Sequence, residues 1–524
     1  MSVELPPPAT PQQGTVEQLQ SQAGSGITVT FQNYQLHVAA SNILDQETVQ
    51  NAVAVADNLS NAVRNIGAAA YLAGYPASQV TYALSGQDLY VLVVPGKISG
   101  IRASEALKPY LSGLENNDPL TDSDLEGKRT LASIAADRAG IAVFPVFEPD
   151  GNGGQVLDFE KNNQASDPTT VRAEFGNPGS RYASRYFGDL EVKTASIWGD
   201  EFRVFAREGF QHLDANDHPG DYHEQNAGWN RVTPWGVFGI NGRNINYEYT
   251  VLTTGTIPQN VQLNGHIWMG EALWLYPIHA SFNSRWNVQA KVDRFSKAGK
   301  VDDTETVPSV VYQRELYTSA ELSTTYAQNF LFIGHSWNFT GGFAARKGFG
   351  DNNANFATLP IHGDEGYLLF RPAATLKFFW NNSISTGIEA SGQYSKDSVP
   401  EQQQLVLGGM GNLTSSLPGV VIGDTGYLAR AFTEVMIPVT DGLELRPKIF
   451  AERGSARFSK SASSTLSGKD FQTLNDAGLE LGIKFTQLID ASVSYAKSFS
   501  DKNISDVVKD SSDARLFFRV SVKL

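Results

Sequence analysis

The sequence of 524 residues contains no cysteine. This absence excludes a disulfide framework, a thiolate metal site and a cysteine nucleophile. Charged residues are also scarce, at 18% of the chain against roughly 25% in a typical soluble domain. The formal net charge of −14 argues against a general nucleic-acid binder, because such proteins present a basic face. We therefore expect no nucleic-acid partner.

Long apolar runs are missing as well. No run approaches the ~20 residues that a membrane helix needs, and "VMIPV" (435–439) is among the longest. The first residues lack the basic and apolar regions of a signal peptide, and residues 1–25 are expected to form a Pro-rich linker. The protein is therefore either soluble or crosses a membrane as strands that alternate apolar and polar residues.

The chain changes its periodicity near residue 166. Before that point the pattern predicts two small units with the order β-α-α-β-β, over 26–100 and 101–166. In the second unit we expect helices over 103–119 and 121–138. From 167 to 524 the helical period disappears, and about sixteen strands of about ten residues follow one another.

The last ten residues, "RLFFRVSVKL", alternate in character. Even positions are apolar, and odd positions are polar except Phe517. An open strand edge in lipid leaves backbone groups without partners, so a membrane sheet must close into a barrel. We therefore predict a transmembrane antiparallel β-barrel whose last strand pairs with the segment near Val171, with Phe517 needing a neighbour inside the lumen. The even positions should form the lipid side of the seam: Phe518, Val520, Val522 and Leu524.

Residues 392–437 carry an ordered set of short motifs. They include Gly392-Gln393, Val399-Pro400, Leu407-Gly408-Gly409 and the Gly-Asp-x-Gly that starts at Gly423, and "FAERG" follows at 450–454. This set resembles the two-partner secretion transporters (TpsB proteins of the haemolysin secretion/activation type), which belong to the superfamily of the barrel-assembly protein BamA. The resemblance implies that the two N-terminal units are periplasmic POTRA domains and that the barrel lies in the Gram-negative outer membrane.

The resemblance also implies a loop, at about 396–423, that folds into the barrel lumen. Its motif residues here are Gly408, Gly409, Leu413, Thr414, Gly423, Asp424 and Gly426. The loop arginine of the family is replaced by Thr414, so an ion pair between this position and a wall carboxylate such as Asp424 cannot form. We expect hydrogen bonds to hold the loop instead, or Arg430 to supply the charge. The residues expected on the barrel wall are Arg430, Glu434 and Glu452, the last in place of the Asp of the family's Phe-x-Asp-x-Gly motif.

The function implied by the resemblance is passive transport of a protein. No nucleotide-binding loop or catalytic signature is present, so no enzyme activity, cofactor or metal is expected. An unfolded, secreted, β-helical partner protein would be caught by strand addition at POTRA edges. The edge residues proposed are Val80, Tyr82, Val143 and Val146. The other expected partners are outer-membrane lipid and periplasmic chaperones, and the protein is expected to be a monomer.

Two other functions remain open from the sequence. One is an insertase that folds other barrels, as BamA does, although BamA-type proteins usually carry more POTRA units. The other is a passive porin, which has no need for the N-terminal third.

Two further groups of residues are a cluster of metal-ligand type and a set of arginines in predicted strands. The segment 212–224 holds residues of metal-ligand type, but their spacing matches no metal motif, and a solvated loop is the preferred interpretation. Its members are His212, Asp214, Asp217, His218, Asp221, His223 and Glu224. Arginines in predicted strands should face the lumen, because a lipid-facing Arg near mid-bilayer costs roughly 2–4 kcal/mol. They are Arg181, Arg185, Arg430, Arg446 and Arg453.

Overall fold

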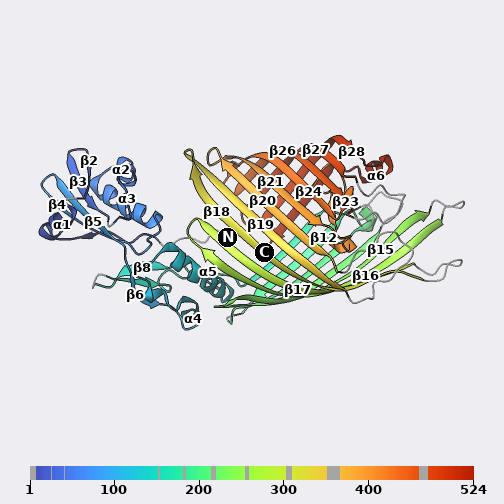
Figure 1. Cartoon of the computed structure of the whole chain (residues 1–524), viewed down its shortest axis with the longest axis horizontal. Helices are drawn as coiled ribbons and strands as arrows, with labels where there is room; N and C mark the ends of the chain where they lie inside the picture. Colours follow the sequence, from blue (N-terminus) through green and yellow to red (C-terminus); the bar gives the residue numbers. More distant parts are fainter. Residues whose placement is uncertain are drawn as a thin grey trace.

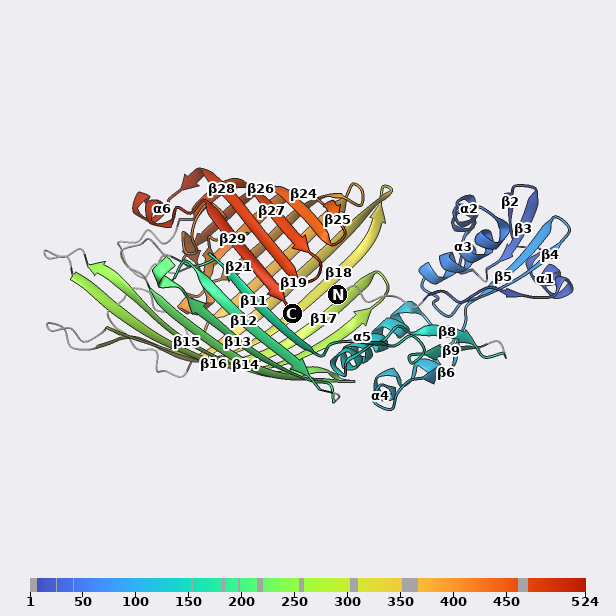
Figure 2. The ribbon, with the colours of Figure 1, turned by 180° about the vertical axis from the view of Figure 1, so that it is seen from behind.

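The computed structural model places two small α/β units at one end of a large barrel (Figures 1 and 2). It describes residues 7–24, 26–40, 42–151, 154–180, 184–196, 198–213, 220–253, 259–301, 310–350, 366–459 and 470–524. None of the helices in these ranges is both long and apolar enough to cross a membrane.

The first α/β unit has one five-stranded sheet with the order β1-β4-β5-β3-β2. Its main elements are β2 (Ile27–Phe31), β3 (Tyr34–Ala39), α2 (Gln46–Ala54), α3 (Leu59–Leu72), β4 (Gln79–Ser85) and β5 (Asp88–Val94). The side chains of Asp45 and Asn58 cap α2 and α3, and Gly74, with φ +97°, follows the end of α3. The apolar faces of both helices form one core with the sheet.

The N-terminal segment lies on this first unit. Strand β1 (Gln12–Gln13) pairs in parallel with β4, and α1 (Val16–Ala23) buries Leu19 and Ala23 against Ala83 and Tyr90. Both views place α1 against the first unit and away from the barrel (Figures 1 and 2). The sheet is therefore covered by helices on both faces.

The second unit has a three-stranded sheet with the order β6-β9-β8. Its elements are β6 (Ile98–Arg102), α4 (Lys108–Leu111), η1 (Leu114–Asn116), α5 (Asp122–Arg138), β7 (Ile141–Ala142), β8 (Val146–Pro149), β9 (Gln155–Asp158) and β10 (Gln164–Ala165). The prediction of one helix over 103–119 was wrong. Gly113, with φ +90°, interrupts it after one short turn. The helix predicted over 121–138 is α5, which begins with a Thr121–Asp124 capping box.

The second unit packs directly on the barrel rim. The hydroxyl of Tyr110 donates to the carbonyl of Val232 (2.9 Å), and Arg138 donates to the carbonyl of Gly199 (2.8 Å). From the first unit, Tyr71 stacks on Phe282 of a barrel turn with ring centroids 4.6 Å apart. Strand ends and turns at the barrel rim thus complete the core of the second unit, and one turn contacts the first unit.

The barrel is closed and antiparallel, as the sequence predicted. Its strands are β11 (Thr169–Gly176), β12 (Phe187–Ala195), β13 (Asp200–Gly209), β14 (Asp221–Thr233), β15 (Gly236–Thr253), β16 (Gln259–Ala280), β17 (Ser284–Val301), β18 (Val310–Phe332), β19 (His335–Gly350), β20 (Leu368–Phe379), β21 (Ile384–Ser395), β24 (Thr425–Val435), β25 (Ile437–Thr440), β26 (Leu443–Arg457), β27 (Gln472–Phe485), β28 (Ile489–Lys502) and β29 (Leu516–Lys523). Segments β24 and β25 both pair with β26 and form one interrupted strand, so the barrel has 16 strands.

The seam lies between β11 and β29. Ala173 is opposite Val522, and Phe175 is opposite Val520. The backbones of Val171 and Leu524 exchange two hydrogen bonds, of 3.1 and 2.8 Å. The chain end therefore meets the segment that the alternating pattern required.

Several strands are longer than the predicted ten residues, and β18 spans 23. The polar start of β14, for example, resembles a loop in the sequence. Asp221, His223 and Glu224, expected in a loop, lie at the start of β14 instead. Asp214, Asp217 and His218 lie outside the described residues.

The inward orientation predicted for the arginines is wrong for Arg453. This residue shares the outward face of β26 with Ile449, and its guanidinium donates to the hydroxyl of Tyr427 (2.9 Å). It lies near the strand end far from the α/β units, where a long cation can reach the polar membrane interface. Arg185 is outside any strand, and Arg181 is not among the described residues.

Candidate functional site: a loop across the barrel lumen

The segment between β21 and β24 forms a small hairpin inside the barrel. After the 3₁₀ turn η3 (Glu401–Gln403), strands β22 (Leu405–Leu407) and β23 (Val421–Gly423) pair and carry a tip at 408–420. Leu407, Leu413 and Val421 are buried in a cluster that the barrel wall completes. The loop is thus a folded element with its own apolar core.

Glycine is required at the start of the tip. Gly408 has φ +118°, and a Cβ there would lie 2.1 Å from the carbonyl oxygen of Leu417. Gly409 has φ +103°, and its N–H donates to the carbonyl of Ser416 (2.7 Å). Leu413 also adopts a left-handed φ of +58°. As a result of these conformations, the backbone N–H groups of Thr414 and Ser415 point at the barrel wall.

Two carboxylates of the wall receive those N–H groups. The Thr414 N–H donates to Oε2 of Glu452 (2.7 Å), and the Ser415 N–H donates to Oδ2 of Asp476 (2.8 Å). Glu452 and Asp476 are opposite each other in register on β26 and β27, and both are buried. The tip is therefore attached through its main chain, without a side-chain cation of its own.

The tip is also attached to the last connection of the barrel. The Leu417 N–H donates to the carbonyl of Ser512 (2.7 Å), at the end of helix α6 (Asp506–Ser512). The Ala514 N–H returns a bond to the carbonyl of Ser415 (3.3 Å). Phe517 is fully buried against Leu417 and Met410 of the loop and Ala514. This contact supplies the lumenal neighbour that Phe517 was predicted to need.

The base of the loop contacts the wall on the far side. Glu401 forms an ion pair with Lys297 of β17 (2.5 Å), and the amide of Gln403 donates to the hydroxyl of Tyr317 of β18 (3.2 Å). Strands β17 and β18 are several strands away from β26 and β27 around the barrel. The loop therefore crosses the lumen and is anchored at both sides.

Asp424, the wall carboxylate considered as a partner for position 414, lies at the end of the loop, and Glu452 takes the place at the tip. Its carboxylate accepts from the N–H group of Val399 (3.1 Å), which joins the start of the loop to its end, and from the N–H group of Ser459 (2.8 Å) in the connection after β26. The neighbouring Gly423 and Gly426 pass close to β26, where a Cβ would lie 2.5 Å or less from a backbone oxygen.

Arg430 lies on the wall below the tip. Its guanidinium is 3.3 Å from Glu452 and 3.2 Å from Glu480, and it covers the ring of Phe450 at 4.4 Å. It therefore balances the charge of Glu452 from the barrel side. Glu434 pairs instead with Lys377 (3.3 Å) and Lys448 (3.5 Å) of the barrel wall.

Ion pairs between neighbouring strands line the rest of the lumen. Arg207 binds Asp189 with two bonds of 2.6–2.7 Å, and Arg243 binds Glu224 at 2.7 Å. These four side chains border a polar cavity of about 570 Å³, together with Arg519 of the last strand. Odd positions of β29 thus face the lumen, whereas Leu516, Val520 and Leu524 are exposed on the outside.

The proposed client edges fall into different environments. Val80 is buried in the core of the first unit with Tyr82 packed beside it, and the free side of their strand is partly taken by β1. Val146 lies in β8, which pairs only with β9 among the described residues. Val143 is outside any strand and packs against the core of the second unit.

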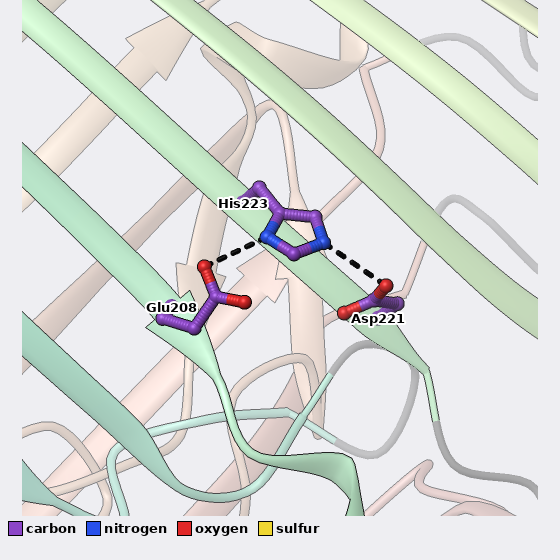
Figure 3. A group of neighbouring side chains, drawn as sticks. All are labelled: Glu208, Asp221 and His223. Carbon is purple, nitrogen blue, oxygen red and sulfur yellow. Dashed lines mark hydrogen bonds and ion pairs between the residues drawn. The ribbon is translucent and has the colours of Figure 1, made fainter.

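A group of metal-ligand type lies on β13 and β14 (Figure 3). Nδ1 of His223 is 2.7 Å from Glu208, and Nε2 is 3.0 Å from Asp221. Both ring nitrogens thus face carboxylates. A metal ion bound to either nitrogen would have to replace the contact of that nitrogen with its carboxylate. The arrangement is therefore better explained as a histidine between two carboxylates than as a metal site.

Asp476 and the α6 connection were missed by the sequence reasoning. In "LNDAGLELG" the apolar residues Leu479 and Leu481 alternate with Asp476 and Glu480, which places the acids on the lumenal face. That alternation was the available signal. The contacts of α6 with the loop carry no such signal, because they are mostly main-chain bonds.

A closed barrel of 16 strands with α/β units at one end and a loop across its lumen defines an outer-membrane barrel with periplasmic POTRA domains. The family described as "haemolysin secretion/activation protein ShlB/FhaC/HecB" matches residues 156–484, more than half of the chain. The protein belongs to this family and is a transporter of the two-partner secretion type.

The solved structures that share the fold include CdiB from two organisms. CdiB from Escherichia coli has a TM-score of 0.65 and 14% identity, over 95% of this chain and 90% of that chain. CdiB from Acinetobacter baumannii has a TM-score of 0.62 and 12% identity, over 100% of this chain and 95% of that chain. No curated protein matches the sequence.

Proposed function

We propose that the protein recognises an unfolded, secreted partner protein in the periplasm and passes it through the barrel lumen to the cell surface. The observation that carries the proposal is the way in which the lumenal loop is attached to the barrel wall. A polypeptide cannot pass while the loop crosses the lumen, and the tip is fastened by hydrogen bonds that can break and re-form. The polar lumen offers an extended chain few apolar surfaces to adhere to.

The periplasmic domains receive the partner in this proposal. The second unit is fixed to the barrel rim by Tyr110 and Arg138, so a chain bound at the POTRA sheets is delivered next to the pore. Transport needs no nucleotide, because folding of the partner outside prevents its return.

Deletion of residues 26–166 tests the proposal in the native host. We expect the shortened barrel to reach the outer membrane and conduct ions but to lose secretion of one large protein, measured by mass spectrometry of the culture medium. A porin would retain its role after this deletion. An insertase would lose several outer-membrane barrels instead of one secreted protein. Either result would contradict the proposal.

A further inference from the structure

The edge of the first POTRA sheet is already occupied by the chain itself. Gln12 and Gln13 lie beside Thr81 and Tyr82 of β4 in parallel register, and the Gly14 N–H donates to the Tyr82 carbonyl (2.9 Å). An open sheet edge is the surface at which extended peptides are captured. We propose that Gln12–Gly14 is a placeholder strand, which an extended segment of the partner protein replaces on β4. The inference rests on the proposed function and names where the partner binds first.

The placeholder is bound in a way that favours exchange. Strand β1 has two residues, and both of its side chains are exposed, so the pairing uses the main chain alone. Main-chain pairing does not depend on sequence, which suits an edge that must accept a foreign chain. The part of β4 beyond Tyr82 pairs only with β5 among the described residues. A longer segment can therefore form more hydrogen bonds than β1 does.

The helix behind the placeholder is weakly fixed as well. The side chains of Asp45, Asn58 and Thr121 cap α2, α3 and α5, whereas Thr15 makes no capping bond to α1. The Thr15 hydroxyl donates to the side chain of Gln18 instead. Helices of eight residues are not stable alone in water. Helix α1 thus depends on the docking of Leu19 and Ala23 and can leave the sheet together with β1.

The residues at the open edge of β4 indicate what kind of partner segment can bind there. Leu84, on the open part of β4, is 48% exposed and offers an apolar contact. Side chains of an added strand alternate between the α3 side and the α1 side of the sheet. The partner segment is therefore an extended stretch with apolar residues at alternate positions, bound parallel to β4.

A reversible lock tests the proposal in the full-length protein. Because the chain has no cysteine, the pair Gln12→Cys and Thr81→Cys introduces the only thiols. The probe is fluorescent α-lactalbumin kept unfolded by reduction and carboxymethylation, and binding in detergent is measured by anisotropy. We expect the dissociation constant of the oxidised protein to be at least ~10-fold higher than that of the same protein after reduction. Each single cysteine variant should show no such difference.

A second variant acts in the opposite direction. A Cβ at Gly14 would lie 2.7 Å from Cγ2 of Thr81, so Gly14→Val should dislodge the placeholder and tighten binding several-fold. Gly100→Val is the matched control, because a Cβ there meets only Val156 at 4.0 Å.

Equal binding by the oxidised and reduced forms would overturn the inference, as would absence of binding by the Gly14→Val protein. Neither result touches the proposed function, which is tested separately by deletion of 26–166: it fails if secretion stays intact or if several outer-membrane barrels are lost instead of one secreted protein.

Discussion

Phe517→Ala should release the lumenal loop. The ring is fully buried and contacts Met410 and Leu417 of the loop and Ala514 of the last connection. Replacing a buried Phe by Ala costs roughly 3–5 kcal/mol. If about half of this cost falls on the loop, the closed state loses about 2 kcal/mol, and the ratio of open to closed states rises roughly 30-fold.

Single-channel recording in planar bilayers measures this ratio directly. The matched control is Phe518→Ala, which removes a neighbouring ring on the outward side that contacts Phe175 and Tyr186 rather than the loop. We expect longer and more frequent openings for the lumenal variant and unchanged gating for the control. Heat-dependent gel mobility verifies that both barrels are folded. Unchanged gating of a folded Phe517→Ala barrel would refute the view that this ring helps to hold the loop.

Three further predictions concern the loop, the seam and the second POTRA unit. Thr414→Arg should lengthen the closed times, because a cation at this buried position meets Glu452; untouched gating and conductance would contradict the hydrogen-bond account of the tip. Asn177→Ala should destabilise the seam by about 2–3 kcal/mol, since Asn177 binds the Leu516 carbonyl (2.9 Å) and the Phe518 N–H (2.7 Å); an unchanged unfolding temperature in gel-mobility assays would refute this. Burial raises the pKa of Asp158, but the N–H of Glu160, Arg102 and the N–H of Lys161 outweigh it and lower the pKa. The Asp158 carboxylate therefore stabilises the second unit fully above the unfolded pKa of about 3.9, and this stabilisation is lost as the pH falls further. In the Asp158→Asn variant, the rate of hydrogen exchange at residues 155–161 should no longer show this acid sensitivity.

The barrel could be predicted because membrane strands must alternate and must close. The alternation in the last ten residues was enough to predict that Leu524 meets the segment near Val171, and it also marked Phe517 as an exception. Strand lengths could not be predicted in the same way. Strands β16 and β18 span 22 and 23 residues, about twice the 9–11 that cross a bilayer, so much of their length need not alternate.

The lumenal loop could be predicted only in part. Its glycines and the loss of a loop cation at Thr414 were visible in the sequence, but Asp424 was not identified as the fastening of the loop base. Among the partners of the tip, Glu452 on β26 was expected on the barrel wall, whereas Asp476 on β27 and the α6 connection lie more than 50 residues further along the chain. Strand β1 was missed because a pairing of two residues with exposed side chains has no sequence pattern.

The most direct test is a lock on the loop itself. Ser416 and Asp513 form an isolated antiparallel bridge between the tip and the last connection, and paired cysteines there can join the two in a chain without other thiols. In the native host, we predict that secretion of the partner stops when this disulfide forms and resumes after reduction. Continued secretion through fully cross-linked barrels would show that the polypeptide does not pass the loop in the lumen.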